Sequence, residues 1–517
     1  MDERIARALD LLPDYLAKHV LLCASALALG VSLALPLAIL AYRRPPFRLP
    51  SLTIVSLVQT IPGLALLALF YPLLLGLSSL TKMLFGGGVP ALGFLPSLLA
   101  LTLYSMLPIF RNGLTGLTGI DPAVIEAADA VGMTSRQRLL KVEAPLAAPV
   151  IMGGIRTAAV WTIGAATLST SVGQTSLGNY IFSGLQTENW IFVLFGCVAA
   201  AALALLVDWL LGLIEIGARR RDPRRIYFGL LALLTGTGAA LTPLLAGGAT
   251  AYFIGAKNFS EQFILADLIA RQIEAQGAST QHRNGLGSAI AFRALVNNDI
   301  DVYVDYSGTL WTNVMERRDV PGREAMLEEL TRWVDERYHA RVLGSLGFEN
   351  AYALAMRRDR AQALGISTIE DLAREAPRLT FGTDLEFLSR AEWASLEKTY
   401  HLQFAAQRSY DPTFMYRALE DGSVDVISAF SSDGRIAAYD LAVLEDPKHA
   451  IPSYDAVILI APQRRDDAVL IDALSPLIGR ISVEEMRQAN LMVDRDTDKK
   501  SPEQAARFLS RAIGLSQ

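Results

Sequence analysis

The side chains best suited to chemistry are polar groups that stand in loops and at helix starts in the second half of the chain. They carry amide or hydroxyl groups that could orient a small ligand by hydrogen bonds, and they are Asn258, Gln262, Ser288 and Thr309. The run Asn284-Gly285-Leu286-Gly287-Ser288 would add backbone N–H donors where a helix begins. Such groups bind a molecule without reacting with it, so they predict a binding site.

Reactive chemistry has no comparable signature in the sequence. The five histidines are scattered without metal-ligand spacing, so we expect no metal site and no cofactor. The two cysteines, Cys23 and Cys197, lie in apolar segments and are interpreted as small buried hydrophobic residues. No Gly-x-x-x-x-Gly-Lys-Ser/Thr phosphate loop occurs, so any ATP hydrolysis must come from another polypeptide. We therefore expect that the protein is not an enzyme.

The elements that must position the polar groups divide the chain into two halves of different composition. The chain has 517 residues, of which 52% are hydrophobic. Residues 1–225 carry a small excess of Lys and Arg, whereas residues 251–517 carry an excess of Asp and Glu. Neither half has the concentrated basic stripe of a nucleic-acid-binding protein. The composition predicts a membrane half followed by an acidic, water-soluble half.

Six apolar runs in the first half are near the roughly 20 residues that a membrane-spanning helix needs. They cover residues 20–42, 51–75, 91–110, 146–170, 190–214 and 226–247. Arginine clusters follow the first, third and fifth runs and precede the fourth, as at Arg43, Arg138 and Arg219. With the N-terminus outside, strict alternation puts every cluster in the cytoplasm. The loops that remain outside, 76–90 and 171–189, contain one basic residue, Lys82.

Few charged residues stand inside these runs. They are Arg156 in the fourth, Asp208 in the fifth and Glu215 just beyond it. Charged groups inside a bilayer often have a function. Because these three lie toward helix ends, we interpret them as structural ion pairs.

A polar, helix-prone segment at 121–145 separates the third and fourth runs. It contains Glu126-Ala127-Ala128-Asp129-Ala130-Val131-Gly132 and ends with Val142-Glu143-Ala144-Pro145. Small alanines would let another protein close around the helix, Gly132 permits a tight turn, and Pro145 can open the next helix. The alternative is an ordinary loop helix between two spans.

The spacing of this segment resembles the cytoplasmic coupling loop of permease subunits in bacterial ATP-binding-cassette (ABC) importers. Val142-Glu143-Ala144-Pro145 departs mildly from the Ile-x-Leu-Pro that usually ends that loop. The resemblance implies an all-α, type I importer-like membrane domain at 1–225. It also implies that an ATPase subunit docks on Glu126, Ala127, Ala128, Gly132 and Pro145.

The second half alternates β-rich runs with amphipathic helices, which is typical of an α/β domain. We expect one lobe at 251–353 and 456–517 and a second lobe at 354–455, joined by a two-stranded hinge. Residues 226–250 would form an additional membrane helix and linker. This is the type II, two-lobed architecture of periplasmic binding proteins, which close on a ligand by hinge motion.

Four segments of this half resemble the binding domains of glycine betaine, carnitine and choline importers. They are Gly255–Gln262, Asp301–Thr309, Asn350–Leu354 and Ser432–Asp440. With the permease half, the resemblance covers nearly the whole chain. It extends to the subgroup in which permease and binding protein are fused, some of whose members take up ergothioneine.

The resemblance implies a quaternary ammonium ligand, whose positive head offers no hydrogen-bond donor. Aromatic faces hold such a head, so we expect a cage of tyrosines. The candidates are Tyr306, Tyr352, Tyr410 and Tyr439, with Phe430 and Trp311 as weaker ones. Core packing is the alternative role for each. Arg435 could grip a ligand carboxylate, or it could pair with Asp433 or Asp440.

The family resemblance implies an importer of glycine betaine, choline or carnitine, serving osmoprotectant uptake. Two copies would pair through their membrane domains, and two ATPase subunits would drive them. The chain would lie in the bacterial inner membrane with its C-terminal domain in the periplasm. An ergothioneine importer is the alternative within the family. A membrane-tethered ligand sensor is the alternative from another class, although the sequence offers no cytoplasmic signalling domain.

Overall fold

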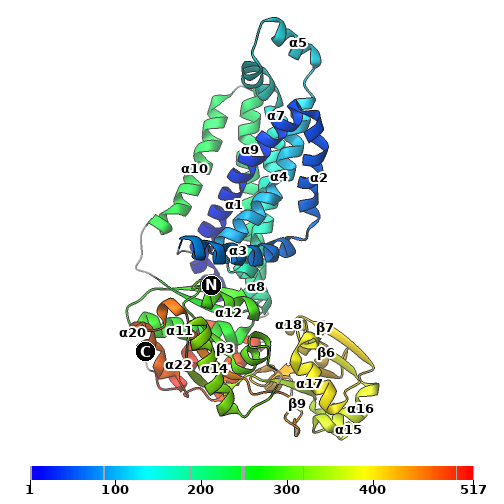
Figure 1. The fold of residues 1–517 in the computed structure, drawn as a ribbon, viewed down its shortest axis with the longest axis vertical. Helices are drawn as coiled ribbons and strands as arrows, with labels where there is room; N and C mark the ends of the chain where they lie inside the picture. The colour runs from blue at the N-terminus through cyan, green and yellow to red at the C-terminus, as the bar shows by residue number, and fades with distance from the viewer. Residues whose placement is uncertain are drawn as a thin grey trace. The chain divides into compact units, whose positions relative to one another are not determined.

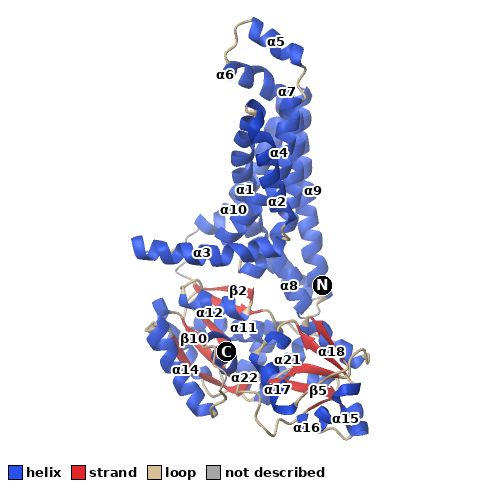
Figure 2. Cartoon of the chain, turned by 45° about the vertical axis from the view of Figure 1, so that its right-hand side comes forward, coloured by secondary structure: helices blue, strands red, loops and turns tan. Residues whose placement is uncertain are grey.

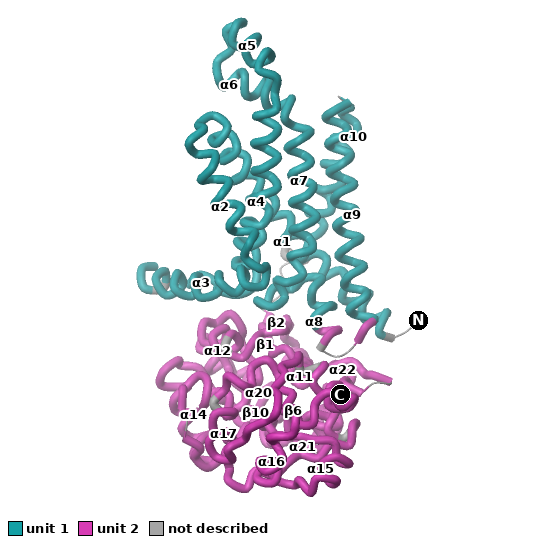
Figure 3. The backbone as a smooth tube through the Cα atoms, turned by 90° about the vertical axis from the view of Figure 1, so that its right-hand side faces the viewer, with its two compact units in different colours: residues 1–182, 191–247 teal, residues 183–190, 248–517 magenta. Residues whose placement is uncertain are grey.

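The structure is a computed structural model that divides into two compact units. It describes residues 3–85, 88–186, 189–220, 222–245, 251–317, 319–495 and 498–515. The first unit comprises Met1–Phe182 and Ile191–Gly247, and the second comprises Ser183–Trp190 and Gly248–Gln517 (Figure 3). The end of the expected linker, 246–250, lies outside the described residues. Each unit is described by itself below.

The first unit is a helical bundle (Figure 1). Its long helices are α1 (Glu3–Arg43), α2 (Arg48–Thr60), α3 (Gly63–Phe85), α4 (Phe94–Thr118), α7 (Ala144–Ala166), α9 (Trp190–Arg220) and α10 (Pro223–Leu245). Within the described residues, six helices are long and apolar enough to cross a membrane. Many of their leucines and aromatic residues point outward, as expected for surfaces that meet lipid. The prediction of a membrane-type domain with about six apolar helices is confirmed.

The apolar run expected at 51–75 is divided between two helices. The chain leaves the helical conformation at Ile61, whose ψ is 125°, so α2 ends at Thr60 and α3 begins at Gly63. Pro62 explains the break, because proline disfavours helical geometry in the residue before it. Tyr104 on α4 donates its hydroxyl proton to the Ile61 carbonyl that the break leaves without a helical partner. As a result, α3 runs across the bundle instead of along it (Figures 1 and 3).

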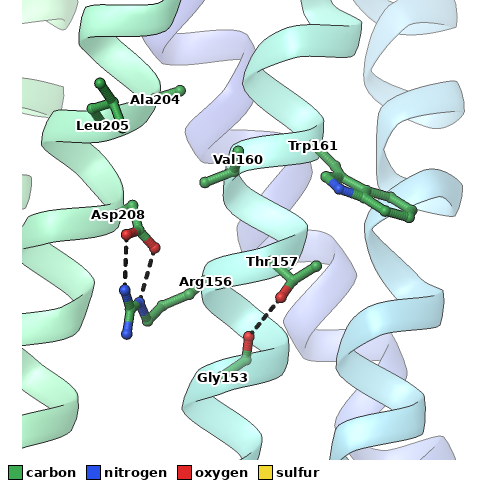
Figure 4. A pocket seen from close by; sticks show the side chains of 8 residues that line it. All are labelled: Gly153, Arg156, Thr157, Val160, Trp161, Ala204, Leu205 and Asp208. Carbon is green, nitrogen blue, oxygen red and sulfur yellow. Dashed lines mark hydrogen bonds and ion pairs between the residues drawn. The ribbon is translucent and has the colours of Figure 1, made fainter.

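The basic residues gather at one end of the bundle. Arg43, at the end of α1, donates to the backbone oxygen of Ser135 at 2.8 Å, within the segment that joins α4 to α7. At the middle of α7, Arg156 pairs with Asp208 (Figure 4) and with Glu215 in the second half of α9, so the two helices run antiparallel and α9 ends near the beginning of α7. The arginines that follow α9 therefore lie at the same end as Arg43 and Arg138. This is the pattern that alternating spans predict.

The second unit is an α/β domain built on two five-stranded sheets (Figure 2). The first sheet has the order β2-β1-β3-β10-β4 and the second has the order β7-β6-β8-β5-β9. The strands are β1 (Tyr252–Lys257), β2 (Thr280–Leu286), β3 (Val302–Tyr306), β4 (Arg341–Glu349), β5 (Tyr352–Arg357), β6 (Thr380–Asp384), β7 (Ala406–Tyr410), β8 (Val426–Phe430), β9 (Leu441–Val443) and β10 (Asp455–Ile460). The expected α/β class with two lobes is confirmed.

Helices cover these sheets. They include α11 (Ser260–Ala275), α12 (Ser288–Val296), α14 (Arg323–Tyr338), α17 (Ala391–Tyr400), α18 (Pro412–Glu420), α20 (Ala468–Leu474), α21 (Val483–Asp494) and α22 (Pro502–Ala512). The chain passes from the first sheet to the second between β4 and β5, and it returns between β9 and β10. Two crossings of this kind are the geometry of a hinge between lobes. The lobe boundaries given above stay a prediction.

Candidate ligand-binding site

Aromatic rings from both sheets of the binding domain meet at the ends of parallel strands. Phe259 follows β1, Tyr306 ends β3, Phe430 ends β8, and Tyr352 begins β5 beside it. Ring centroids are 6.2 Å apart for Phe259 and Tyr306, 6.4 Å for Phe259 and Phe430, and 4.9 Å for Tyr352 and Phe430. Open α/β sheets bind their ligands at such strand ends. We call these four residues the aromatic cluster.

A cation already lies over one ring of this cluster. The Arg390 guanidinium carbon stands 5.0 Å from the centre of the Tyr352 ring. Arg390 is buried, and its Nη2 atom donates to Glu392 at 2.8 Å. The Glu392 carboxylate also accepts the hydroxyl proton of Tyr454. The site thus combines aromatic faces that attract a cation with a guanidinium that suits a carboxylate.

A buried carboxylate ties the two sheets together beside the aromatic cluster. Glu261 on α11 accepts hydrogen bonds from Tyr306 Oη at 2.6 Å, Asn350 Nδ2 at 3.0 Å, Ser432 Oγ at 2.5 Å and Asn490 Nδ2 at 2.9 Å. Burial raises the pKa of Glu261, while these donors lower it. Because Ser432 follows β8 and Asn350 lies between β4 and β5, the carboxylate joins residues that belong to both sheets.

Four of the residues predicted from the sequence come together here. Tyr306, Tyr352 and Phe430 belong to the aromatic cluster, and Gln262 donates its side-chain amide to the Tyr306 hydroxyl at 3.0 Å. Thr309 is buried in the short helix Ser307–Thr309 that follows Tyr306. Their role in binding a ligand stays a prediction.

Other predicted residues make no contact with the aromatic cluster that is described above, and their binding role stays a prediction. Asn258 is exposed, and Ser288 is the partly exposed first residue of α12. Tyr410 and Tyr439 pack against a second group of buried residues that includes Met415 and Tyr416.

Trp311 is a core residue. It is fully buried, and its indole nitrogen donates to the Asp319 carbonyl at 2.8 Å. This buried position does not support the expectation that Trp311 belongs to the aromatic cage.

Arg435 takes the alternative role that the sequence left open. Its guanidinium bonds Asp433 twice, at 3.0 and 2.7 Å, and lies 4.1 Å from the centre of the Tyr416 ring. Asp440, the other possible partner, pairs with Arg358 at 2.6 Å. A ligand carboxylate would have to replace Asp433, so this role for Arg435 stays a prediction.

Several residues of the site were missed by sequence reasoning. They are Phe259, Glu261, Asn350, Arg390, Glu392, Ser432 and Asn490. Glu261 and Phe259 belong to the segment Gly255–Gln262, which resembles a binding domain, so this segment could have identified them. Asn490 is 229 residues away from its partner Glu261, so no local pattern could have found it.

The segment expected to couple to an ATPase forms a helical loop at the basic end of the bundle. It consists of α5 (Pro122–Ala130), a turn at Gly132 with a φ of +78°, α6 (Ser135–Arg138) and a π-helical turn at Leu139–Glu143 that leads into α7. Glu126 and Ala127 are exposed, Ala128 is buried, and Pro145 lies in the first turn of α7. An exposed, rigid helix of this kind can dock into another protein, and that use stays a prediction.

Comparisons with known protein families match both halves of the chain. The model described as "Substrate binding domain of ABC-type glycine betaine transport system" matches residues 252–510. The model described as "Binding-protein-dependent transport system inner membrane component" matches residues 26–220. The membrane-component match ends with α9, and the binding-domain match begins with β1.

Individual relatives agree with these families. The chain is similar to an ergothioneine transport permease/ergothioneine binding protein of Helicobacter pylori, with 29% identity over 90% of this chain and 83% of that protein. It is similar to a choline transport system permease protein of Bacillus subtilis, with 37% identity over 38% of this chain and 84% of the relative. A carnitine transport binding protein of Listeria monocytogenes shares 30% identity over 47% of this chain and 80% of its own length.

Proposed function

Because the chain belongs to the ABC importers of the glycine betaine transport family, with a membrane permease and a substrate binding domain in one polypeptide, we propose that it imports quaternary ammonium compounds. Glycine betaine, choline and carnitine are the candidate cargoes, and osmoprotectant uptake is the expected purpose. The observation that carries the proposal is the aromatic cluster of Phe259, Tyr306, Tyr352 and Phe430. A quaternary ammonium head has no N–H to donate, so aromatic faces are the surfaces that select it.

The proposed machine contains two copies of this chain and two copies of a separate ATPase subunit. Membership of the permease family implies an ATPase partner, and the loop around Glu126 is the surface we assign to it. The membrane domains would pair to form one pathway in the bacterial inner membrane. The binding domain would lie in the periplasm and deliver the cargo at high local concentration.

A second cargo, ergothioneine, is favoured by one observation. The relative that matches 90% of this chain is named for ergothioneine, and it carries permease and binding protein in one polypeptide as this chain does. Ergothioneine is also a betaine, so the aromatic cluster suits its trimethylammonium head equally well. The remainder of the molecule would have to be recognised by other groups.

Calorimetric titration of the purified full chain against glycine betaine, choline, carnitine and ergothioneine would test the cargo. We expect at least one of them to bind and the tightest to name the cargo. Binding of an uncharged osmolyte or an ordinary amino acid, with none of the four bound, would overturn the proposal.

The aromatic cluster itself is tested by Phe430→Ala and Tyr352→Ala. Each variant should weaken binding about tenfold, since a desolvated cation–π contact contributes on the order of 1–2 kcal/mol. Phe414→Ala is the matched control, because Phe414 is an exposed aromatic residue on α18 in the same lobe. Equal effects of all three changes would mean that the cluster is only a packing core.

Transport is tested with the full chain and its ATPase in sealed vesicles. Cargo should accumulate only with ATP, and cargo should raise ATP turnover. A membrane-tethered sensor would bind the same cargo without moving it, so binding without ATP-dependent uptake would favour that alternative.

A further inference from the structure

One carboxylate holds residues at both ends of the aromatic cluster. Glu261 is buried at the beginning of α11, and each of its two oxygens accepts two hydrogen bonds. Oε1 accepts from Tyr306 at 2.6 Å and from Asn350 at 3.0 Å. Oε2 accepts from Ser432 at 2.5 Å and from Asn490 at 2.9 Å. Because all four donors are also buried, water does not readily replace a bond that is lost.

The bonds at Oε1 fix the ring of Tyr306, on the first sheet. A phenol hydroxyl has a single proton to donate, and here that proton goes to Glu261. The same hydroxyl accepts from the Gln262 amide at 3.0 Å, and the Gln262 side-chain oxygen accepts from the Lys257 backbone at 3.2 Å. The Tyr306 ring is therefore held at its tip, while its centre lies 6.2 Å from that of Phe259.

The bonds at Oε2 hold the chain just beyond Phe430, on the second sheet. Ser432 follows Phe430 by two residues, and its backbone oxygen accepts a further bond from Asn490 at 2.8 Å. The neighbouring backbone oxygen of Ser431 accepts from Arg487 Nε at 2.8 Å. Asn490 and Arg487 both belong to α21, which packs against α11 and β4 on the side of the first sheet. The chain that leaves β8 therefore docks on a helix of the other lobe.

This docking is close. A Cβ atom at Gly434 would stand 2.3 Å from the backbone nitrogen of Leu491, so a side chain there would force the segment away from α21. Phe430 thus belongs to the second sheet and is anchored to the first through Ser432. Its ring is nearly parallel to that of Phe259, with 3° between the planes and 6.4 Å between the centres.

We propose that Glu261 is the positioning residue of the aromatic cluster, which holds Tyr306 of the first sheet and Phe430 of the second at one spacing. This role rests on the proposed function, in which aromatic faces select a quaternary ammonium head. Such a head is held by several faces at once, so its affinity depends on their separation. Hydrogen bonds to a charged group are stronger than neutral ones, and a carboxylate with four donors therefore resists a change in that separation.

Tyr306→Phe and Ser432→Ala test this coupling in the purified full chain. The first change removes the hydroxyl bonded to Oε1 and keeps the aromatic face, and the second removes the hydroxyl bonded to Oε2. Calorimetric titration with glycine betaine, choline, carnitine and ergothioneine measures binding. We expect each change to weaken binding of the compounds that the wild type binds by about fivefold, a part of what one hydrogen bond to a charged group contributes.

The double variant of Tyr306→Phe and Ser432→Ala separates positioning from a merely structural role. The two side chains share Glu261 as a partner, so the loss of either bond should already release the spacing. We therefore expect the double variant to bind about as weakly as the weaker single variant, whereas independent sites would multiply to a loss of about 25-fold. Multiplied effects would overturn the proposal, and so would wild-type affinity in both single variants.

Tyr303→Phe is the matched control. Tyr303 lies on the same strand as Tyr306, and its buried hydroxyl donates to another carboxylate, that of Asp305, at 2.6 Å. This change should leave cargo affinity as in the wild type, and combining it with Ser432→Ala should add nothing to the effect of Ser432→Ala. A loss of affinity in Tyr303→Phe equal to that in Tyr306→Phe would overturn the assignment to Glu261.

Glu261→Gln tests the carboxylate directly. The change puts an amide N–H₂ group where an oxygen accepted two bonds, so it should weaken binding at least as much as either hydroxyl deletion. Adding Tyr306→Phe to it should have little further effect, and a further fivefold loss would overturn the proposal. Thermal unfolding shows whether this variant folds. If it does not, the pair Tyr306→Phe and Ser432→Ala still decides, because both changes leave the carboxylate in place.

The same titrations distinguish the two ways to fail. If the wild-type chain bound none of the four compounds, the proposed function itself would fail. If the wild type bound at least one of them and the effects of Tyr306→Phe and Ser432→Ala were independent, only the role of Glu261 would fail.

Discussion

At the scale of single residues, the binding domain buries several charges and satisfies each with named partners. Glu261 accepts four hydrogen bonds, and Arg435 pairs with Asp433 while stacking on Tyr416. Isolated buried charges would cost several kcal/mol, whereas fully bonded ones can hold two lobes in a fixed arrangement. The contacts of Glu261 with Tyr306 and Ser432 place this arrangement directly beside the aromatic cluster. Charge and aromatic surface therefore lie side by side in the candidate site.

Asp494, at the end of α21, gives this region a pH dependence. Burial raises the pKa of Asp494 to about 7, while Arg435 lowers it and Asp433 raises it. The unfolded chain would titrate near pH 3.9. Between these values the folded state keeps a proton that the unfolded state releases. The free energy of unfolding therefore falls as pH rises through this window, by up to about 1.4 kcal/mol per pH unit.

Asp494→Asn should remove the decrease in the free energy of unfolding that rising pH causes. We expect the variant to be more stable than the wild type above pH 7 and equal to it near pH 4, because asparagine carries no charge to bury. Thermal unfolding of the binding domain in the purified full chain, followed by tryptophan fluorescence across this pH range, measures the effect. Asp472→Asn on α20 is the control, since Asp472 is exposed. Parallel pH profiles for wild type and Asp494→Asn would contradict the assignment.

At the scale of elements, the loop between α4 and α7 is held by one arginine. Arg138 Nη1 contacts Asp129 at 2.6 Å, and Arg138 Nε contacts Glu143 at 2.8 Å. Asp129 belongs to α5, and Glu143 is fully buried at the start of α7. This bracing, together with the capping box of Thr134 and Gln137, makes the loop a rigid piece attached to α7. A rigid piece can transmit motion between an ATPase and a membrane helix.

Arg138→Ala should uncouple ATP hydrolysis from transport. The change frees α5 from α7 and leaves the Glu143 carboxylate buried without its cation, so force from the ATPase would no longer reach the bundle. We expect ligand-stimulated ATP turnover and uptake to fall about tenfold or more, with ligand affinity unchanged. Arg136→Ala is the control, two residues away in the same helix. Wild-type ATP turnover and uptake in Arg138→Ala would show that coupling does not need the contacts of Arg138 with Asp129 and Glu143.

At the scale of the whole molecule, one polypeptide combines a membrane permease with its substrate binding domain. The arginines that follow α1 and α9 and those of the loop lie at one end of the bundle. The positive-inside rule assigns that end to the cytoplasm. The chain then crosses once more through α10 before the binding domain begins. In the proposed topology, the loop and the binding domain would lie on opposite sides of the membrane.

Labelling with an impermeant thiol reagent tests this topology in cells with a permeabilised outer membrane. In a background with Cys23→Ala and Cys197→Ala, we expect Lys448→Cys in the binding domain to be labelled and Ser135→Cys in the loop to be protected. Disrupting the inner membrane should expose both positions. Labelling of both before disruption would contradict the proposed sidedness.

How much of the site the sequence predicted can be judged from particular residues. Tyr306, Tyr352, Phe430 and Gln262 were recognised because each stands beside a strand end or a hinge crossing within a recognisable segment. Arg390 and Glu392 were missed, because they stand in no such segment and approach Tyr352 only when the second lobe folds. Tyr410 and Tyr439 were chosen by the same local reasoning, yet they pack with Met415 and Tyr416. Local position along the chain does not determine which aromatic rings meet in the fold, and the binding role of each tyrosine stays a prediction.

The sequence by itself determined the membrane and α/β halves and the grouping of arginines at alternate span ends. Hydrophobic length and charge placement act along the chain, so they can be read without coordinates. Only the tertiary structure decided that Arg435 pairs with Asp433 and that Glu261 accepts hydrogen bonds from four donors that are distant in the sequence. It also decided that Arg156 lines a hollow whose lining includes Trp161 (Figure 4). These outcomes depend on competition among partners brought close by folding, and the free energy of each contact is set by what surrounds it.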